Sequence, residues 1–378
     1  MTHSSIRWRR KVRLTLLAAF TFLHSVCPVH AGDWNVIKCG GRDYLTLDNI
    51  SQFYGLGAVT HVSNSLVLGA PGHGLRGSVG SNEFYINNLK FILSYPIIED
   101  RGELLVSRMD LTKVIEPVLR PSRIRNAGLV DTIVLDPGHG GDDNGATSLW
   151  GNEKTFSLDV ACRAKDLLVG QGFQVKMTRS TDVFIPLEDR VRFANQFRNA
   201  LFISIHFNSG DGGASGLETY TLAPRGVPSM AADGPSLSDL QLCAGNAEDS
   251  ENMALATATH ASLVYHLQMY DRGIKRARFV VIRDINIPGV LIEGGFLSNS
   301  EDSRKIATPA YRQQMANCIL AAVQNYRAAV GSRLPVPTAP SMAGIRSLEL
   351  RNLVESLDAP GFRSAPPNEP LVITPSTN

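Results

Sequence analysis

The sequence predicts an α/β protein, a doubly wound twisted sheet flanked by helices and preceded by a small β-rich (α+β) domain. Between residues 130 and 330, short apolar runs alternate with longer amphipathic stretches, as strands alternate with helices. Residues 33–118 instead hold short strand-like runs, turns and a weak internal repeat. The chain of 378 residues is also too long for one compact core of usual size.

The first 31 residues read as a secretory signal peptide. A basic start precedes a short apolar core, and Val29–Ala31 is typical of a cleavage site. The apolar run is too short to span a bilayer well, so we expect no transmembrane segment after cleavage and a periplasmic or secreted protein. The other predicted divisions are a β-rich domain over 32–120, a larger domain over 130–330 and a Pro/Ser-rich, disordered tail over 331–378.

Charge and cysteine content exclude some functions. Removing residues 1–31 takes away five basic and no acidic side chains, which changes the net charge from +2 to −3. The remaining charge does not favour a nucleic-acid partner or an anionic membrane surface. Four cysteines remain without any CxxC pair, so a cysteine-ligated zinc is not predicted, and the sequence does not determine their pairing.

The N-terminal domain shows an internal repeat. Residues 36–53 and 97–115 each predict a strand, a turn, a second strand and a short helix, with further strands at 65–68 and 83–87 around a Gly-rich segment. The pattern resembles the small β-rich domain at the N-terminus of copper amine oxidases. His61 and His73 have no partner at ligand spacing. We therefore assign this domain no catalytic chemistry, and glycan binding, partner binding and spacing remain open as its role.

The larger domain alternates strands with helices. The predicted strands are 132–136, 173–178, 201–206, 217–222, 278–282 and 289–293, and the predicted helices are 152–169, 186–198, 251–268 and 309–329. Gly170–Gly172 ends the first helix as a C-terminal cap should. A polar stretch occupies 223–250. The alternation predicts the doubly wound sheet.

Three apolar runs of this domain each lead to a side chain that can bind a metal. They are 133–138 before His139, 201–205 before His206 and 289–292 before Glu293. In open α/β sheets, sites form where the carboxyl ends of strands meet. Glu153 follows His139 by 14 positions and falls in the first turn of a helix, where the helix dipole favours a carboxylate. We expect these four side chains to converge at one edge of the sheet.

Two histidines and a glutamate are typical ligands of catalytic zinc, which leaves a fourth position for water. The sequence therefore predicts Zn2+ on His139, Glu153 and His206. Zinc lowers the pKa of its water to about 7, and a nearby carboxylate can take the proton and later protonate the leaving amine. Glu293 has this role of general base in our prediction. The predicted enzyme is a hydrolase without a serine or cysteine nucleophile.

The same residues also allow simpler interpretations. A single histidine at a strand end is more often structural, but two His and two Glu at expected element ends of one domain favour a metal site. The segment Asp136–Gly141 also suits a tight turn or a phosphate loop. It lacks the lysine of GxxxxGK[ST], so nucleotide binding is not predicted.

Residues 131–328 resemble the zinc-dependent N-acetylmuramoyl-L-alanine amidases of the bacterial cell wall, also called amidase type 3. The matching segments are Val134–Asp142, Glu153–Lys154, Thr178–Arg179, Ser204–Asn208, Arg272–Lys275 and Leu291–Asn299. The resemblance implies zinc on His139, Glu153 and His206 and catalysis by Glu293. It implies peptidoglycan as the substrate, cleaved at the amide between N-acetylmuramic acid and L-alanine, with an envelope regulator protein as a further candidate partner.

Two other functions remain open at this point, a zinc peptidase that cuts the stem peptide of peptidoglycan and a non-catalytic wall-binding or activator protein. Residues 223–252 are longer than in minimal family members, and we consider both a mobile flap that gates the site and a solvated surface loop. Among weaker candidates, we predict that Arg179 holds an internal acid rather than a substrate carboxylate and that Asp142 organises a loop rather than binding a metal. We predict surface or interface positions for His260 and His266.

Overall fold

The computed structural model describes residues 34–70, 73–124, 127, 129–232 and 234–331. The predicted signal peptide lies outside the described residues, as does the predicted tail beyond Gly331. Among the helices of the described part, none combines the length and the apolar character needed to cross a membrane.

The predicted repeat of the N-terminal region is confirmed. The first copy comprises β1 (Val36–Cys39), β2 (Arg42–Thr46) and α1 (Leu47–Tyr54), and the second β8 (Ile98–Asp100), β9 (Glu103–Ser107), α2 (Arg108–Asp110) and a π-helical turn (Leu111–Ile115). Their strands form one antiparallel sheet in the order β1-β2-β9-β8. Thr46 and Ser107 cap α1 and α2 in the same way, because each side chain accepts a hydrogen bond from the backbone three residues on.

A meander of five strands separates the two copies. It comprises β3 (Thr60–Val62), β4 (Ser65–Ala70), β5 (His73–Ser78), β6 (Glu83–Ile86) and β7 (Leu89–Ile92). The sequence does not predict β3, β7 or β5, the last of which lies in the Gly-rich segment. Its glycines permit close packing, since a Cβ at Gly77 would lie 2.8 Å from the ring of Phe84. Through β7, the meander pairs with a strand of the larger domain, β16 (Asp271–Ala277).

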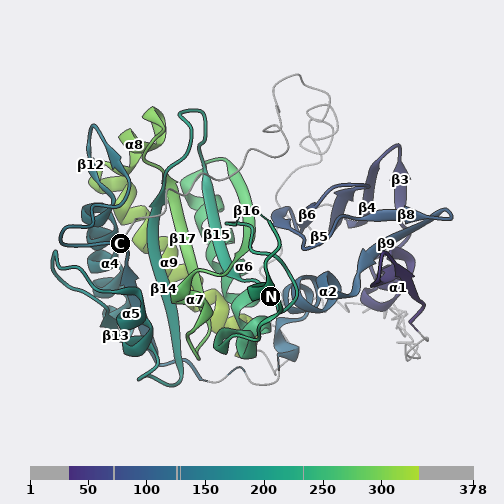
Figure 1. Cartoon of the computed structure of the whole chain (residues 1–378), viewed down its shortest axis with the longest axis horizontal. Helices are drawn as coiled ribbons and strands as arrows, with labels where there is room; N and C mark the ends of the chain where they lie inside the picture. Colours follow the sequence, from purple (N-terminus) through teal and green to yellow (C-terminus); the bar gives the residue numbers. More distant parts are fainter. Residues whose placement is uncertain (1–33, 71–72, 125–126, 128, 233, 332–378) are drawn as a thin grey trace, which may run out of the picture. The chain divides into compact units, whose positions relative to one another are not determined.

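The larger domain contains the predicted twisted sheet (Figure 1). Its strands are β10 (Thr132–Pro137), β13 (Gln174–Met177), β14 (Ala200–Asn208), β15 (Leu217–Leu222), β16 and β17 (Gly289–Phe296), in the order β13-β10-β14-β17-β15-β16. The first four strands in that order are parallel, and β15 runs antiparallel to β17. The prediction of a strand at 278–282 is wrong, because these residues form α7 (Val280–Arg283) and the strand precedes them. A short apolar run does not by itself distinguish the two structures.

Helices cover both faces of this sheet, as predicted. They are α4 (Glu153–Gly170), α5 (Leu187–Ala194), α6 (Asp249–Leu267), α7, α8 (Ser300–Ile306) and α9 (Pro309–Gly331). Phe202, Tyr220 and Leu291 form a core with α5 and α7 on one face. On the other face, Phe207 packs against Phe156 of α4, with ring centroids 6.3 Å apart.

The second face also contains His260 of α6, and the prediction that it lies at the surface or at an interface is wrong. The side chain is fully buried and hydrogen-bonds with Thr219 at 3.0 Å and with Asp271 at 2.9 Å. Its helix is apolar on most sides, so spacing alone does not show which side faces the sheet.

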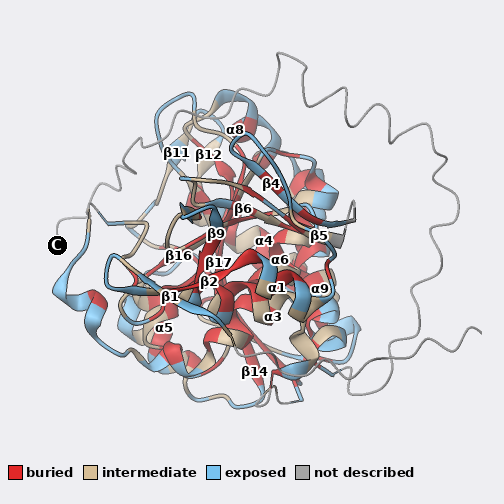
Figure 2. Cartoon of the chain, turned by 90° about the vertical axis from the view of Figure 1, so that its right-hand side faces the viewer, coloured by how far each residue is buried: buried red, intermediate tan, exposed pale blue. Residues whose placement is uncertain are grey.

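The central strands β14 and β17 are almost completely buried (Figure 2). Only three of their residues are partly accessible, His206, Asn208 and Glu293. All three lie toward the carboxyl ends of the strands. The two central strands are therefore accessible to solvent only at the edge of the sheet where the sequence predicts a site.

Candidate metal centre

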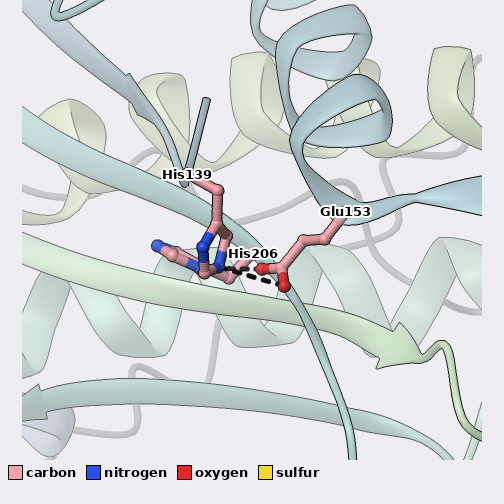
Figure 3. A group of neighbouring side chains, drawn as sticks. All are labelled: His139, Glu153 and His206. Atoms are coloured by element: carbon pink, nitrogen blue, oxygen red, sulfur yellow. Dashed lines mark hydrogen bonds and ion pairs between the residues drawn. The ribbon is translucent and has the colours of Figure 1, made fainter. Parts of the chain in front are cut away.

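The structure brings His139, Glu153 and His206 together (Figure 3). Nε2 of His139 lies 3.0 Å from Oε2 of Glu153, and Nδ1 of His206 lies 2.8 Å from Oε1. One potential ligand atom from each residue lies within 4.8 Å of the others. The glutamate is buried and the imidazoles are partly exposed. The three groups can therefore meet a small ion that enters from solvent.

The chain after β10 is shaped to place His139. This residue has a φ of 58°, in the left-handed region that few side chains adopt without a local reason. A Cβ at Gly138 would lie 2.2 Å from Cε1 of His206, and one at Gly145 would lie 2.5 Å from Oε2 of Glu153. Glycine is thus required where backbone approaches the cluster this closely.

Arg179 binds the backbone directly before His139. Its Nε donates to the carbonyl oxygen of Pro137 at 3.0 Å, and its Nη2 donates to that of Gly138 at 2.7 Å. The side chain is buried. The prediction that Arg179 has an internal role is confirmed, but the side chain binds backbone carbonyl oxygens rather than an internal acid.

Arg190 of α5 is a second buried arginine, which the sequence analysis does not identify. It donates to the carbonyl oxygen of His139 at 2.8 Å and pairs with the buried carboxylate of Asp136 at 2.8 Å. Burial disfavours the charge of Asp136, but Arg190 outweighs it and holds the pKa of that carboxyl below its usual value. The sequence could have identified Arg190 because it lies on the apolar side of a predicted helix, in line with Leu187 and Ala194.

Asp143, rather than Asp142, organises the loop around His139. Its Oδ2 lies 2.8 Å from Nδ1 of His139, and its Oδ1 accepts a hydrogen bond from the backbone of Gly145. The prediction for Asp142 is therefore wrong by one position. Because Asp143 holds Nδ1, the other ring nitrogen, Nε2, faces Glu153. A carboxylate on the second ring nitrogen is the usual way in which a metal-binding histidine is oriented.

Glu153 is held by four donors. Besides the two imidazoles, the backbone N–H of Phe207 donates to Oε1 at 3.0 Å and that of Ala146 donates to Oε2 at 2.8 Å. Burial raises the pKa of Glu153, but the two histidines outweigh it and bring that pKa far below its usual value. Burial lowers the pKa of His139, but Glu153 and Asp143 raise it to about 9. Without a metal, the cluster is thus an imidazolium–carboxylate pair.

Glu293 stands beside this cluster, directly opposite His206 in the pairing of β14 with β17. The register shifts just after this pair, because β17 has one extra residue there, and such bulges re-aim side chains at strand ends. Its Oε2 is buried and has no hydrogen-bond partner among the described residues. Burial, Glu153 and Glu218 raise the pKa of Glu293 well above its usual value.

Glu218 of β15 lies directly opposite Glu293, and the sequence analysis does not identify it. This fully buried carboxylate accepts hydrogen bonds from Arg272 and Lys275, both at 2.6 Å. Asn208 donates to its other oxygen at 3.1 Å. Burial raises the pKa of Glu218, but the two cations outweigh it and lower that pKa. Two facing glutamates thus have opposite protonation tendencies.

The segment 223–250 does not lie at this edge. Because β15 runs antiparallel to β17, its last residue, Leu222, is at the opposite end of the sheet from Glu293. Ala223 then donates to the carbonyl oxygen of Ala277, and Asp239 pairs with Arg278 at 3.1 Å beyond the end of β16. The hypothesis that this segment gates the cluster is therefore contradicted.

The fold and cluster can be compared with known proteins. Residues 133–325, just over half of the chain, match the family model described as N-acetylmuramoyl-L-alanine amidase. The chain belongs to this family. AmiA of Escherichia coli strain K12 is 31% identical over 228 residues, which cover 54% of this chain and 78% of AmiA. AmiC of Escherichia coli O6:H1 is 32% identical over 244 residues, which cover 57% of this chain and 58% of AmiC.

Among solved structures, the catalytic domain of CwlV, an N-acetylmuramoyl-L-alanine amidase from Bacillus (Paenibacillus) polymyxa, is 29% identical with a TM-score of 0.44. The alignment covers 52% of this amidase-family chain and 98% of the CwlV domain.

Replacing Arg190 with methionine should destabilise the protein by about 3–5 kcal/mol, because it leaves the carboxylate of Asp136 buried and unpaired. Urea unfolding measures the change. Arg192→Met is the matched control, since Arg192 lies on the same helix with its side chain 72% exposed and should cost less than about 1 kcal/mol. Equal stability of the two variants would contradict this account.

The metal-free protein should lose stability as the pH rises. The raised pKa of His139 contributes stability that is fully present below 6.5 and is lost as the pH passes about 9. Glu153 adds no slope there, because its lowered pKa affects only acidic conditions. Urea unfolding in chelator between these two pH values tests this. The His139→Gln variant should show a smaller decline than the wild type, because the raised pKa of Glu293 contributes a decline to both proteins. An equal decline in both proteins would argue against a contribution from His139.

Proposed function

We propose that this chain is an exported, zinc-dependent peptidoglycan amidase that hydrolyses the amide bond between N-acetylmuramic acid and L-alanine. One observation carries the proposal: in a member of the amidase family, His139, Glu153 and His206 converge beside Glu293, whose Oε2 has no hydrogen-bond partner among the described residues. The names of AmiA and AmiC state the same bond for two relatives.

The residues of the cluster fit zinc. Imidazole nitrogens and a carboxylate are the donors that zinc prefers, and three of them with one open position is the usual catalytic set. His139, Glu153 and His206 would hold the ion, and Asp143 would orient His139. Zinc in this position supplies a Lewis acid for the scissile carbonyl and makes water more acidic.

Glu293 is the proposed general base. It accepts one proton from the attacking water while the hydroxyl oxygen bonds to the carbonyl carbon, and it returns that proton to the nitrogen of L-alanine as the C–N bond breaks. Its raised pKa supports this role, because a carboxylate with a higher pKa is a stronger base. The absence of a competing donor among the described residues leaves Oε2 free to bind water.

Location and domain limits are part of the same proposal. The basic and apolar pattern of residues 1–31 supports export to the periplasm or medium. We assign catalysis to residues 130–330, and residues 32–120 have no part in the chemical steps.

Two substitutions separate metal binding from catalysis. His139→Ala should lose zinc and activity, because it removes one of three ligands. Glu293→Gln should retain zinc and lower kcat by about 10²–10⁴-fold, because it removes the proton acceptor. Metal analysis of the purified variants and release of soluble product from cell walls measure these effects.

The products and a chelator complete this test. The proposal requires a free muramoyl sugar and an intact stem peptide, and it requires that a chelator stop the reaction. Cleavage within the stem would indicate a peptidase, and lysis unaffected by the chelator would exclude the zinc mechanism.

A further inference from the structure

Exposed apolar side chains lie on two segments beside the cluster. A hairpin of β11 (Thr147–Ser148) and β12 (Gly151–Asn152) ends directly before Glu153. At its tip, Leu149 is 100% exposed and Trp150 is 55% exposed. Three more large apolar side chains are about half exposed, Val183 and Phe184 on the loop after β13 and Leu187 at the start of α5. Exposed apolar side chains on segments that flank a site are typical of a binding surface.

Both segments are fixed to the chain that supplies the ligands. A Cβ at Gly151 would lie 2.8 Å from the ring of Phe156, so the hairpin packs tightly on α4. Asp182 accepts a hydrogen bond from the backbone of Gly141 at 2.8 Å and pairs with Lys154 at 3.0 Å. The apolar rim, meaning Leu149, Trp150, Val183, Phe184 and Leu187, is therefore held in place relative to His139 and Glu153.

The rim has no charge of its own. Residues 147–152 contain no ionisable side chain, and neither do residues 183–187. Flat apolar and aromatic groups without charge suit an uncharged ring that offers C–H groups on its face. They do not suit a carboxylate.

The other side of the cluster is cationic. Arg272 and Lys275 both pair with one oxygen of Glu218, so the three groups together keep a positive charge. The side chain of Arg272 is 23% exposed, and its two Nη atoms have no hydrogen-bond partner in the described part of the chain. A guanidinium with free donors suits a carboxylate.

The sheet order separates these two surfaces. The rim follows β10 and β13, and the cations are held by β15 and β16. The strands that carry His206 and Glu293 lie between them. A substrate cut at the cluster must therefore extend toward the neutral rim on one side and toward the cations on the other.

We propose that peptidoglycan lies across this edge in one orientation, with its glycan on the apolar rim and its stem peptide toward Arg272. This inference rests on the proposed amidase function. The amino sugars are uncharged, because the carboxyl of muramic acid forms the scissile amide, and the stem carries carboxylates. The two halves of the substrate thus match the two surfaces.

The rim is tested with substrates that differ in glycan length. Trp150→Ala should lower kcat/KM on polymeric glycan strands by about tenfold, mainly through KM, because neighbouring sugars lose their contact. On a monomeric N-acetylmuramoyl-peptide, its effect should be less than about twofold. Tyr265→Ala is the matched control, since Tyr265 is 78% exposed on α6 and should be silent on both substrates.

Arg272 is tested with monomers whose stem carboxylates are free or amidated. The wild type should prefer the free acid by about tenfold, and Arg272→Gln should lose that preference rather than all activity. Arg192→Gln, an exposed arginine on α5, should retain the preference. A purely structural effect would reduce the rates on both monomers equally.

Each outcome decides the orientation. Equal effects of Trp150→Ala on polymer and monomer, or an unchanged preference in Arg272→Gln, would overturn it. Binding to phosphatidylglycerol vesicles that depends on Trp150, with normal cleavage of both substrates, would assign the rim to a membrane and also overturn it. A wild type that cleaves none of these substrates would instead reject the amidase function itself.

Discussion

A buried ion pair under the turn at residues 136–139 is the interaction on which the candidate site depends. Asp136 and Arg190 neutralise each other in the core, and Arg190 and Arg179 together bind the carbonyl oxygens of Pro137, Gly138 and His139. Burying an ion pair costs desolvation free energy. Here the buried pair also holds the backbone turn in place through its hydrogen bonds. The left-handed conformation of His139 is stable in this setting because its neighbours determine it.

At this edge of the sheet, the surroundings of Glu153, Glu218 and Glu293 determine the protonation state that each carboxyl group favours. Glu153 is satisfied by two histidines and two backbone donors, and Glu218 by two cations and two neutral donors. Glu293 lies near both anions and has no such partner in the described residues. Placing one acid beside anions that already have their own partners raises the pKa of that acid, which makes its carboxylate a stronger proton acceptor.

The topology of the sheet also places the long segment 223–250 and the connections next to the cluster at opposite edges. The antiparallel strand β15 directs the long segment 223–250 to the far edge, where it packs beside α7 and β16. Two connections at the edge with the cluster are the hairpin before Glu153 and the loop after β13. These connections are short and anchored, so they can present apolar side chains to a polymer without closing over the cluster.

Local patterns in the sequence were sufficient for much of the fold. Apolar runs located β10, β14, β15 and β17, and helical periodicity located α4, α6 and α9, because both depend on neighbours within a few positions. The four side chains His139, Glu153, His206 and Glu293 were found in the same way, since each stands at the end of such an element. The strand β16 was misplaced because a short apolar run fits a helix or a strand equally well.

Only the tertiary structure identified Arg190, Glu218 and the burial of His260. A charged side chain inside an apolar pattern looks like an interruption until its partner is known, and these partners lie 54, 54 and 41 positions away along the chain. Such pairs depend on which strands become neighbours and in which register. The sequence by itself thus determined which elements form and which ends carry metal-binding groups, and the packing of the sheet decided which buried charges hold them.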